Sequence, residues 1–264
     1  YDTIGLHDYE ALDASIVNVA LPSLARDLEV TPAQSVLVVT AYQLALVMAL
    51  LPCAALGESI GFRKVYGAGV ALFMLASLLC AAAPSLPWLV AARFLQGLGG
   101  AAVMALGVAL LRQVVPPGSL GAAIGWNAMA VALASAAGPS IGALILAGVD
   151  WRWLFAVNLP VAAASLLAGR ALPDIPGRRR PLDGISIALN ATVFAGAVTG
   201  ADLFLRRPGA AVTLFAAAAL ALVMLVRREG AKATPLVPLD LLRLPPFRMS
   251  AMASVLCFTG QAAA

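Results

Sequence analysis

The ionisable residues that lie within or beside long apolar stretches are the sequence's candidates for chemistry. Asp13 stands near the start of one such stretch, and Arg93 lies inside another, three residues before Gln96. Apolar surroundings drive a carboxylate towards its neutral form, so Asp13 is a candidate proton carrier. A guanidinium stays charged, so Arg93 needs a carboxylate, backbone carbonyls or trapped water, and Gln96 shares about the same helix face. Two alternatives remain open: Asp13 caps a helix at the membrane edge, or Arg93 snorkels to the interface.

A proline between glycines is a second kind of candidate. In the segment Gly138-Pro139-Ser140-Ile141-Gly142 the proline removes a backbone donor and bends a helix, while the glycines let a neighbouring helix pack into the bend. Taken alone, this pattern indicates close helix packing. The same interpretation applies to most of the other glycine pairs at helical spacing, which are Gly57/Gly61, Gly121/Gly125 and Gly196/Gly200.

A short charged segment is the third candidate. Glu58 precedes a turn residue, Gly61, and two bases, Arg63 and Lys64. Such a segment is also typical of a simple loop on the positively charged side of a membrane. The residues alone leave both interpretations open.

The elements that position these residues are transmembrane helices. The 264 residues are 62% hydrophobic and only 11% charged, with mean hydropathy +0.94, against about 25% charged residues in soluble domains. About 20 apolar residues cross a bilayer, so the apolar runs amount to about nine spans. Backbone groups in lipid must pair internally, and continuous rather than alternating apolar runs favour helices over a barrel. The predicted fold class is therefore an all-α integral membrane helix bundle.

Basic residues divide unequally between the two sides of these spans. Of the seventeen Lys and Arg residues, twelve fall on one side, four fall on the other, and Arg93 lies within a span. The positive-inside rule makes the twelve-residue side, and with it the N-terminus, cytoplasmic. We therefore expect a multi-pass protein of the bacterial inner (plasma) membrane. The net charge of +4 reflects this topology and does not indicate nucleic-acid binding.

Five segments together resemble one branch of a known family. In order and spacing they are similar to motifs of the fourteen-helix drug:proton antiporters of the major facilitator superfamily. The segments are LDASIVNVALP (12–22), ESIGFRK (58–64), RFLQGLGGA (93–101), GPSIG (138–142) and WRWLFAVNLP (151–160). The resemblance covers essentially Leu12 to the C-terminus. It implies a major-facilitator-type bundle with an N-terminal six-helix lobe, two extra linker helices and the start of a second lobe.

The resemblance implies a role for each matching residue. Asp13 would be a proton- or cation-responsive acid. The buried base that answers its protonation would be Arg93, with its motif completed by Gln96 and Gly97. The helix bend that seals the path in antiporters would be shaped by Gly138, Pro139 and Gly142. The cytoplasmic latch of the outward-facing state would consist of Glu58, Gly61, Arg63 and Lys64.

The sequence departs from these motifs at several positions. The latch motif has Gly, Asp and Arg where this chain has Ala54, Glu58 and Ser59, so we expect a weaker latch. The last glycine of the antiporter motif is replaced by Ala143. Residues 1–10 include acids that cannot cheaply enter lipid, so the first helix is either shortened or preceded by non-native sequence.

The resemblance and the charged linkers together predict the domain organisation. We expect a non-native-looking or truncated tail at 1–10, a six-helix lobe at 11–172, a basic cytoplasmic linker at 173–183, two extra linker helices at 184–226, a cytoplasmic loop at 227–246 and the first helix of an incomplete C-terminal lobe at 247–264.

The predicted function is secondary active transport: proton-coupled efflux of lipophilic or cationic drugs, a substrate class that comes with the resemblance. The proton gradient supplies the energy without a cofactor. The expected partners are membrane lipid, protons, the small substrate and a missing C-terminal lobe. One lobe with three further helices cannot enclose a path, so we expect the chain alone to be inactive in transport. The alternatives are a transporter of another substrate, such as an antibiotic, sugar or amino acid, and a non-transporting partner subunit.

An enzyme is not expected, because clustered metal ligands or nucleophiles are lacking in the apolar runs. The one histidine, His7, is interpreted as a solvated tail residue. The three cysteines, Cys53, Cys80 and Cys257, lie inside apolar runs and are interpreted as small core residues.

Overall fold

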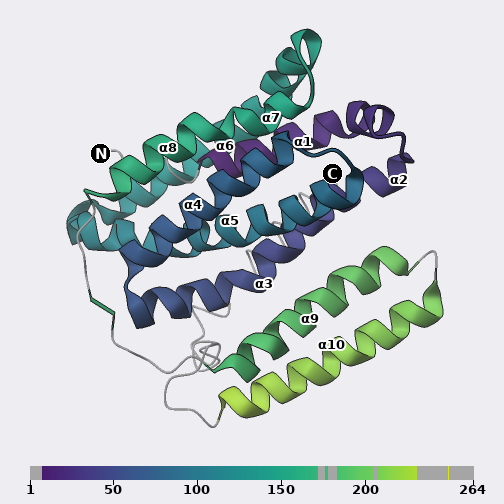
Figure 1. The fold of residues 1–264 in the computed structure, drawn as a ribbon. Helices are drawn as coiled ribbons and strands as arrows, with labels where there is room; N and C mark the ends of the chain where they lie inside the picture. Colours follow the sequence, from purple (N-terminus) through teal and green to yellow (C-terminus); the bar gives the residue numbers. More distant parts are fainter. Residues whose placement is uncertain (1–7, 172–175, 178–182, 205–206, 231–248, 250–264) are drawn as a thin grey trace. The chain divides into compact units, whose positions relative to one another are not determined.

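The structure is a computed structural model of the chain. It describes residues 8–171, 176–177, 183–204, 207–230 and 249, and the side chains of residues 8–15 lie outside the description. The chain divides into two compact units, 1–182 and 183–264, and each is described here by itself. Helices make up both units, which confirms the all-α fold class (Figure 1).

The first unit contains the helices of the expected six-helix lobe. Their bounds are α1 Asp8–Asp27, α2 Pro32–Ser35, α3 Leu37–Ile60, α4 Phe62–Ala81, α5 Leu86–Val114, α6 Leu120–Gly148, α7 Arg152–Ala156 and α8 Asn158–Gly169, with a 3-10 turn, η2, at Pro117–Ser119. Local sequence sets several of these ends. Thr31 and Gln34 form a reciprocal cap at the start of α2. Gly61 takes a φ of 109°, a conformation that favours glycine, and so separates α3 from α4.

Seven helical segments of the described residues are long and apolar enough to cross a membrane. They run over Pro32–Ile60, Phe62–Ala81, Leu86–Val114, Pro117–Gly148, Arg152–Gly169, Gly184–Leu203 and Pro208–Glu229. α1 has the length of a span, with 20 residues, but its first half carries Asp8, Glu10 and Asp13. The expected ninth run, 247–264, and the loop at 231–246 lie outside the described residues apart from Met249.

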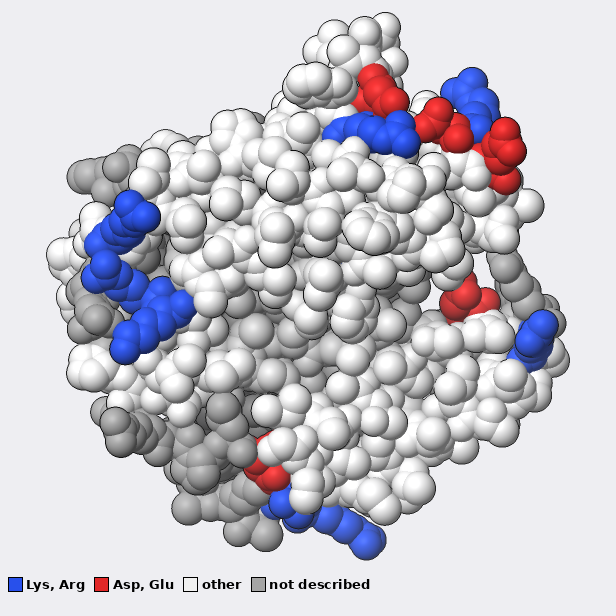
Figure 2. All heavy atoms as spheres, viewed as in Figure 1, with Lys and Arg blue, Asp and Glu red and all other residues white. Residues whose placement is uncertain are grey.

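Charged side chains gather at the two ends of the first unit, with an uncharged surface between them (Figure 2). One end has mainly bases, at the start of α4 and the ends of α5 and α8, which are Arg63, Lys64, Arg112 and Arg170, with the acid Glu58 at the end of α3. The other end has bases and acids together around the end of α1 and the start of α7. This separation matches the unequal count of bases on alternate sides, and the cytoplasmic assignment of the basic end stays a prediction.

The second unit is a hairpin of α9 (Gly184–Leu203) and α10 (Pro208–Glu229). Gly196 and Gly200 lie where a Cβ atom would meet the Leu214 carbonyl at 2.9 Å and the Phe215 ring at 3.1 Å, so these glycines allow the close approach that their spacing predicts. At the other end of the hairpin, Asp183 caps α9 through the Ile185 amide and forms an ion pair with Arg228 at 2.7 Å.

A polar cluster fastens the mixed-charge end of the first unit. The Trp151 indole donates to Asp27 at 2.8 Å, and Arg152 pairs with Asp27 at 3.2 Å and with Asp150 at 2.9 Å. Arg152 also donates to the Ala83 carbonyl at 3.2 Å. These contacts join the last residue of α1 and the end of α4 to the turn between α6 and α7.

We predict that Trp151→Phe weakens the acid sensitivity of the fold. The indole hydrogen bond, followed by Arg152, lowers the pKa of Asp27, and burial opposes this shift. A lowered folded-state pKa contributes stability above the unfolded value, and that stability is lost as pH falls through the folded value. Thermal unfolding in detergent should therefore show a variant that is less stable than wild type at neutral pH. The difference should shrink below the ordinary Asp pKa of about 3.9.

Trp153→Phe is the matched control, because Trp153 is 57% exposed and its indole takes no part in the side-chain hydrogen bonds of this cluster. It should follow the wild-type pH profile. A Trp151→Phe deficit that stays constant with pH would show that the indole acts through packing alone.

Candidate functional site

Arg93 lies at the centre of the first unit, on α5, with 0% of its surface exposed. Its Nη1 donates to the Gln96 side-chain oxygen at 2.6 Å, and its Nε donates to the Val38 carbonyl at 3.4 Å. The guanidinium also lies over the Tyr42 ring, with 4.2 Å between Cζ and the ring centroid, and 5.7 Å from the centroid of Phe155. The arginine is therefore buried among α3, α5 and α7 and does not snorkel to the interface. Aromatic faces and carbonyl oxygens are suitable neighbours for a desolvated cation.

Gln96 continues this arrangement as a directed chain of hydrogen bonds. Its oxygen accepts from Arg93, which can only donate, so its amide nitrogen is left to donate to the Ser77 hydroxyl at 2.8 Å. Ser77 in turn donates to the Phe73 carbonyl at 2.8 Å. The Cys80 thiol lies 3.8 Å from the same Gln96 oxygen. Gln96, Ser77 and Cys80 are all fully buried, so the chain fixes the arginine from α4 as well as from α5.

Glycines on α5 bring the neighbouring helices close enough to build this site. A Cβ atom on Gly97 would overlap the Tyr42 carbonyl and lie 2.9 Å from the Ala45 Cβ. On Gly99 it would lie 2.6 Å from the Phe73 backbone nitrogen. Because Tyr42 and Phe73 supply a ring and a carbonyl to the site, these two glycines determine its geometry as well as its packing.

The acid at the start of the sequence motif, Asp13, lies in α1, and its side chain is outside the described part. The next turn of α1, with Ile16 and Val17, is buried in the same apolar cluster as Ala92 and Phe155. Both residues are three or four positions after Asp13, the spacing of one helix face. Asp13 lies five residues after the start of α1 at Asp8, so the alternative that it caps this helix is wrong. That it carries protons stays a prediction.

The proline segment lies in the middle of α6, where the helix continues through Pro139. Gly138 and Gly142 are buried, and Gly142 lies against α1, because its Cβ would meet Ile16 at 3.4 Å. Pro139 itself is exposed. The glycines thus pack α6 against α1, whereas the role of the segment in sealing a path stays a prediction.

The residues expected to form a latch lie around the α3–α4 junction at the basic end. Gly57 is tightly packed against Leu106, and Gly61 makes the break between the helices. Glu58 and Lys64 are exposed and Arg63 is half-buried. The structure brings these residues to one end of the unit but does not place them near Arg93. Their action as a latch stays a prediction.

Glycine spacing alone is wrong at one predicted pair. A Cβ atom on Gly121 or Gly125 would have no described atom within 4 Å, so these residues do not mediate helix packing within the described residues. The spacing shows only that two glycines share a face, and here that face of α6 is exposed.

The fold and the motif residues can now be compared with known proteins. The family profile described as Major Facilitator Superfamily matches residues 10–264, which is most of the chain. The chain belongs to the major facilitator superfamily. Two relatives of the chain are named as a transporter and as a transport protein. The family and the apolar helices make the chain a multi-pass membrane protein.

Three curated relatives define the neighbourhood of this superfamily member. The Escherichia coli protein named uncharacterized transporter YebQ is 43% identical over 95% of the chain and 56% of its own length. The putative multidrug resistance protein MdtD of Salmonella typhi is 32% identical over 93% and 53%. The probable transport protein HsrA of Haemophilus influenzae is 34% identical over 74% and 42%. The chain therefore spans about half the length of the curated relatives it matches. The multidrug name agrees with the branch that the motifs resemble.

Solved structures of major facilitator transporters share the fold at low sequence identity. The POT family transporter PepTSo aligns with a TM-score of 0.59 at 14% identity, over 91% of the chain and 55% of that structure. A bacterial homologue of the human lysosomal transporter Spinster aligns with a TM-score of 0.52 at 17% identity, over 84% and 57%. These likenesses support the helix arrangement and carry no information on substrate.

Several site residues were missed in the sequence. Tyr42, Ser77 and Phe155 contact Arg93 or Gln96 from other helices, yet none stands in a motif segment that assigns it this role. Cys80 was interpreted only as a core residue. The sequence does show polar and aromatic residues in these spans. Which of them contact Arg93 cannot be predicted without knowing which helices pack together. Within the described residues, no group of three or more His, Cys, Asp or Glu side chains is placed to hold a metal ion.

We predict that Gly97→Ala destabilises the protein and disturbs the site. The added methyl group would overlap the Tyr42 carbonyl, which belongs to rigid helix backbone, so α3 and α5 must separate. Overpacking of this kind costs about 1–3 kcal/mol. Thermal unfolding in detergent measures the loss.

Gly125→Ala is the matched control, since it adds the same methyl group inside α6, where no described atom lies within 4 Å. It should leave stability unchanged or raise it by up to about 1 kcal/mol. Equal effects of the two substitutions would contradict a specific approach at Gly97.

Proposed function

We propose that this chain is the N-terminal part of a secondary transporter that couples proton entry to the export of lipophilic cations. The carrying observation is Arg93, a fully buried base held by Gln96 and the Tyr42 ring. Ionisable groups within a membrane bundle are costly and mark coupling or substrate sites. The motif resemblance and the relative named as a multidrug resistance protein support the export of drugs.

In the proposed coupling, protonation of Asp13 removes the negative charge that stabilises Arg93. When Asp13 is ionised, its charge stabilises the guanidinium; when a proton binds, that attraction disappears. A charge pair at 4 Å contributes about 4 kcal/mol at an effective dielectric constant of about 20. Inverting a two-state equilibrium from 1:99 to 99:1 needs about 5.5 kcal/mol, so one such pair supplies a large part of the change. Gln96 and Tyr42 hold the guanidinium in both protonation states.

The proposed substrate class follows from the same charges. A lipophilic cation competes with the proton for an ionised acid, and apolar walls bind the rest of the molecule. Each ligand then biases the transporter by its differential affinity for the two conformations. The basic end faces the cytoplasm in this proposal, in accord with the positive-inside rule.

We predict that Asp13→Asn in a longer protein containing both lobes abolishes coupling. The amide cannot exchange a proton, so efflux of a fluorescent lipophilic cation from everted vesicles should no longer follow an imposed proton gradient. Downhill equilibration of the same cation should persist, because the path remains. Glu29→Gln, an exposed acid after α1, should behave as wild type. Gradient-driven efflux at the wild-type rate in Asp13→Asn would contradict a role of Asp13 in coupling.

Arg93→Lys is expected to impair coupling although it keeps the charge. The ammonium group lacks the planar fork that binds Gln96 and the flat face that lies on Tyr42. We expect gradient-driven efflux to fall about tenfold or more, since a lost charged hydrogen bond contributes about 1.5–3 kcal/mol. Arg112→Lys, an exposed base on the same helix, is the matched control and should retain activity. Retained coupling in Arg93→Lys would show that charge alone suffices.

The chain of 264 residues by itself is expected to be inactive in transport. A path with alternating access requires two lobes that move against each other. Reconstitution of this chain in vesicles should therefore give no gradient-driven efflux of a lipophilic cation, whereas the longer protein gives clear efflux. A panel that includes an antibiotic, a sugar and an amino acid separates drug export from transport of another substrate.

A further inference from the structure

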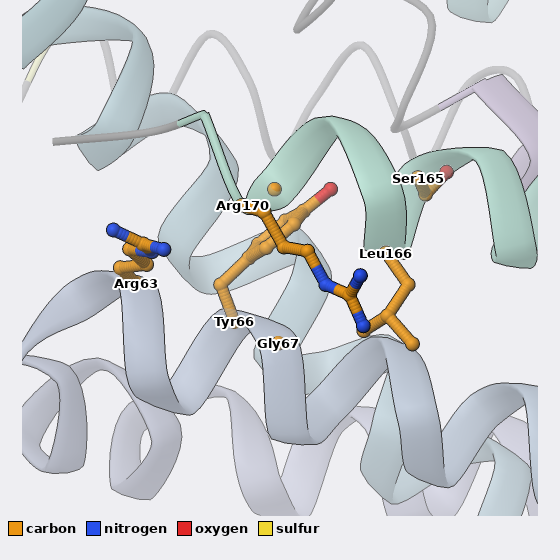
Figure 3. Close-up of a pocket in the computed structure, with 7 residues that line it drawn as sticks. Arg63, Tyr66, Gly67, Ser165, Leu166 and Arg170 are labelled. Atoms are coloured by element: carbon orange, nitrogen blue, oxygen red, sulfur yellow. The ribbon is translucent and has the colours of Figure 1, made fainter. Parts of the chain in front are cut away.

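A hollow of about 200 Å³ opens between α4 and α8 at the basic end of the first unit (Figure 3). Arg63, Tyr66 and Gly67 line it from the start of α4. From the end of α8 and the residue after it come Ser165, Leu166 and Arg170. None of the described residues that line it is acidic. The hollow is separate from the buried Arg93 site, which lies between α3, α5 and α7.

The two arginines of this hollow have no partner among the described residues. Neither the Arg63 nor the Arg170 side chain makes a hydrogen bond, ion pair or ring contact there. Figure 3 shows their side chains on either side of Tyr66. Two cations without an acidic neighbour in the lining make an anion the suitable ligand for this hollow. A guanidinium binds phosphate through paired hydrogen bonds, which makes phosphate the anion of best fit.

The position of the hollow favours a phosphate that belongs to a lipid. Arg63 is the second residue of the candidate span Phe62–Ala81, and Arg170 directly follows the span Arg152–Gly169. Both bases therefore lie at a membrane surface, where the headgroups are. Leu166 supplies an apolar wall, and Leu167, on the same turn, is 61% exposed and available to an acyl chain. Basic pockets between transmembrane helices are known to bind anionic headgroups.

We propose that this hollow binds the phosphate of an anionic phospholipid headgroup, with Arg63 and Arg170 as its charged partners. The positive-inside bias explains why bases lie at this end, but it does not explain why two of them, from two helices, line the same hollow. Arg112 is an exposed base at the same end that lines no part of it. Bound lipid would hold α4 and α8 together at this surface. This proposal does not depend on the transported substrate.

Native mass spectrometry of the purified 264-residue chain tests the proposal directly. The probes are phosphatidylglycerol, zwitterionic phosphatidylcholine and soluble glycerol phosphate. Two variants act by different means. Arg170→Gln removes one charge at an exposed position. Gly67→Leu keeps both charges and fills the hollow, because a Cβ at Gly67 has no described atom within 4 Å. Arg112→Gln is the matched control for lost charge, and thermal unfolding without added lipid checks that every variant is folded.

Wild type and Arg112→Gln should retain phosphatidylglycerol in preference to phosphatidylcholine. Arg170→Gln and Gly67→Leu should bind phosphatidylglycerol at least about tenfold more weakly than wild type. This is the effect of losing one charged hydrogen-bonded contact. If glycerol phosphate stabilises wild type as well as the lipid does, and neither variant responds, the phosphate site stands and its source is soluble. Phosphatidylglycerol binding that is equal in all folded variants, or lowered equally by Arg112→Gln, would overturn the proposal.

Discussion

The burial of one permanent charge is the constraint on which the first unit depends. Removing a cation from water costs several kcal/mol even after relaxation, so Arg93 can persist at 0% exposure only if its surroundings replace water. Gln96, the Val38 carbonyl and two aromatic rings do so from three helices. These contacts hold α3 and α7 against α5. Arg93 therefore determines how the helices around it pack, in addition to its proposed role in coupling.

Small residues make this arrangement possible in lipid, where apolar surface alone gives little reason for helices to associate. Gly97 and Gly99 let α5 approach α3 and α4 until there is no room for a Cβ atom, whereas Gly142 lies in a looser contact of α6 with Ile16 of α1. Large apolar residues also lie on the outer surface: Leu144 on α6 is 75% exposed. Small residues thus lie where helices come closest, while large apolar residues lie both in the core, as Phe73 does, and on the exposed surface.

Sequence reasoning reached the fold and the centre of the site because both depend on local rules. Long apolar runs predict spans, and the spacing of three between Arg93 and Gln96 predicts a shared helix face, which their 2.6 Å contact confirms. Sequence reasoning failed where the role of a residue depends on which other helix it faces. Gly125 and Gly97 look alike in sequence, but only Gly97 meets another helix. Tyr42 could not be chosen over other aromatic residues before α3 was placed beside α5.

The two ends of the unit differ in a way that bears on how such a lobe could move. At the mixed-charge end, Trp151 and Arg152 bind Asp27, so α1, α4 and α7 are joined by side-chain hydrogen bonds. At the basic end, the side chains of Arg63 and Arg170 make no such bonds among the described residues, and a hollow opens between their helices. Separation of the helices around Arg93 would remove its hydrogen-bond and ring partners, so movement at the centre of the unit is costly. We therefore expect relative movement within the lobe to cost least at the basic end, where the side chains of Arg63 and Arg170 have no partner among the described residues to lose.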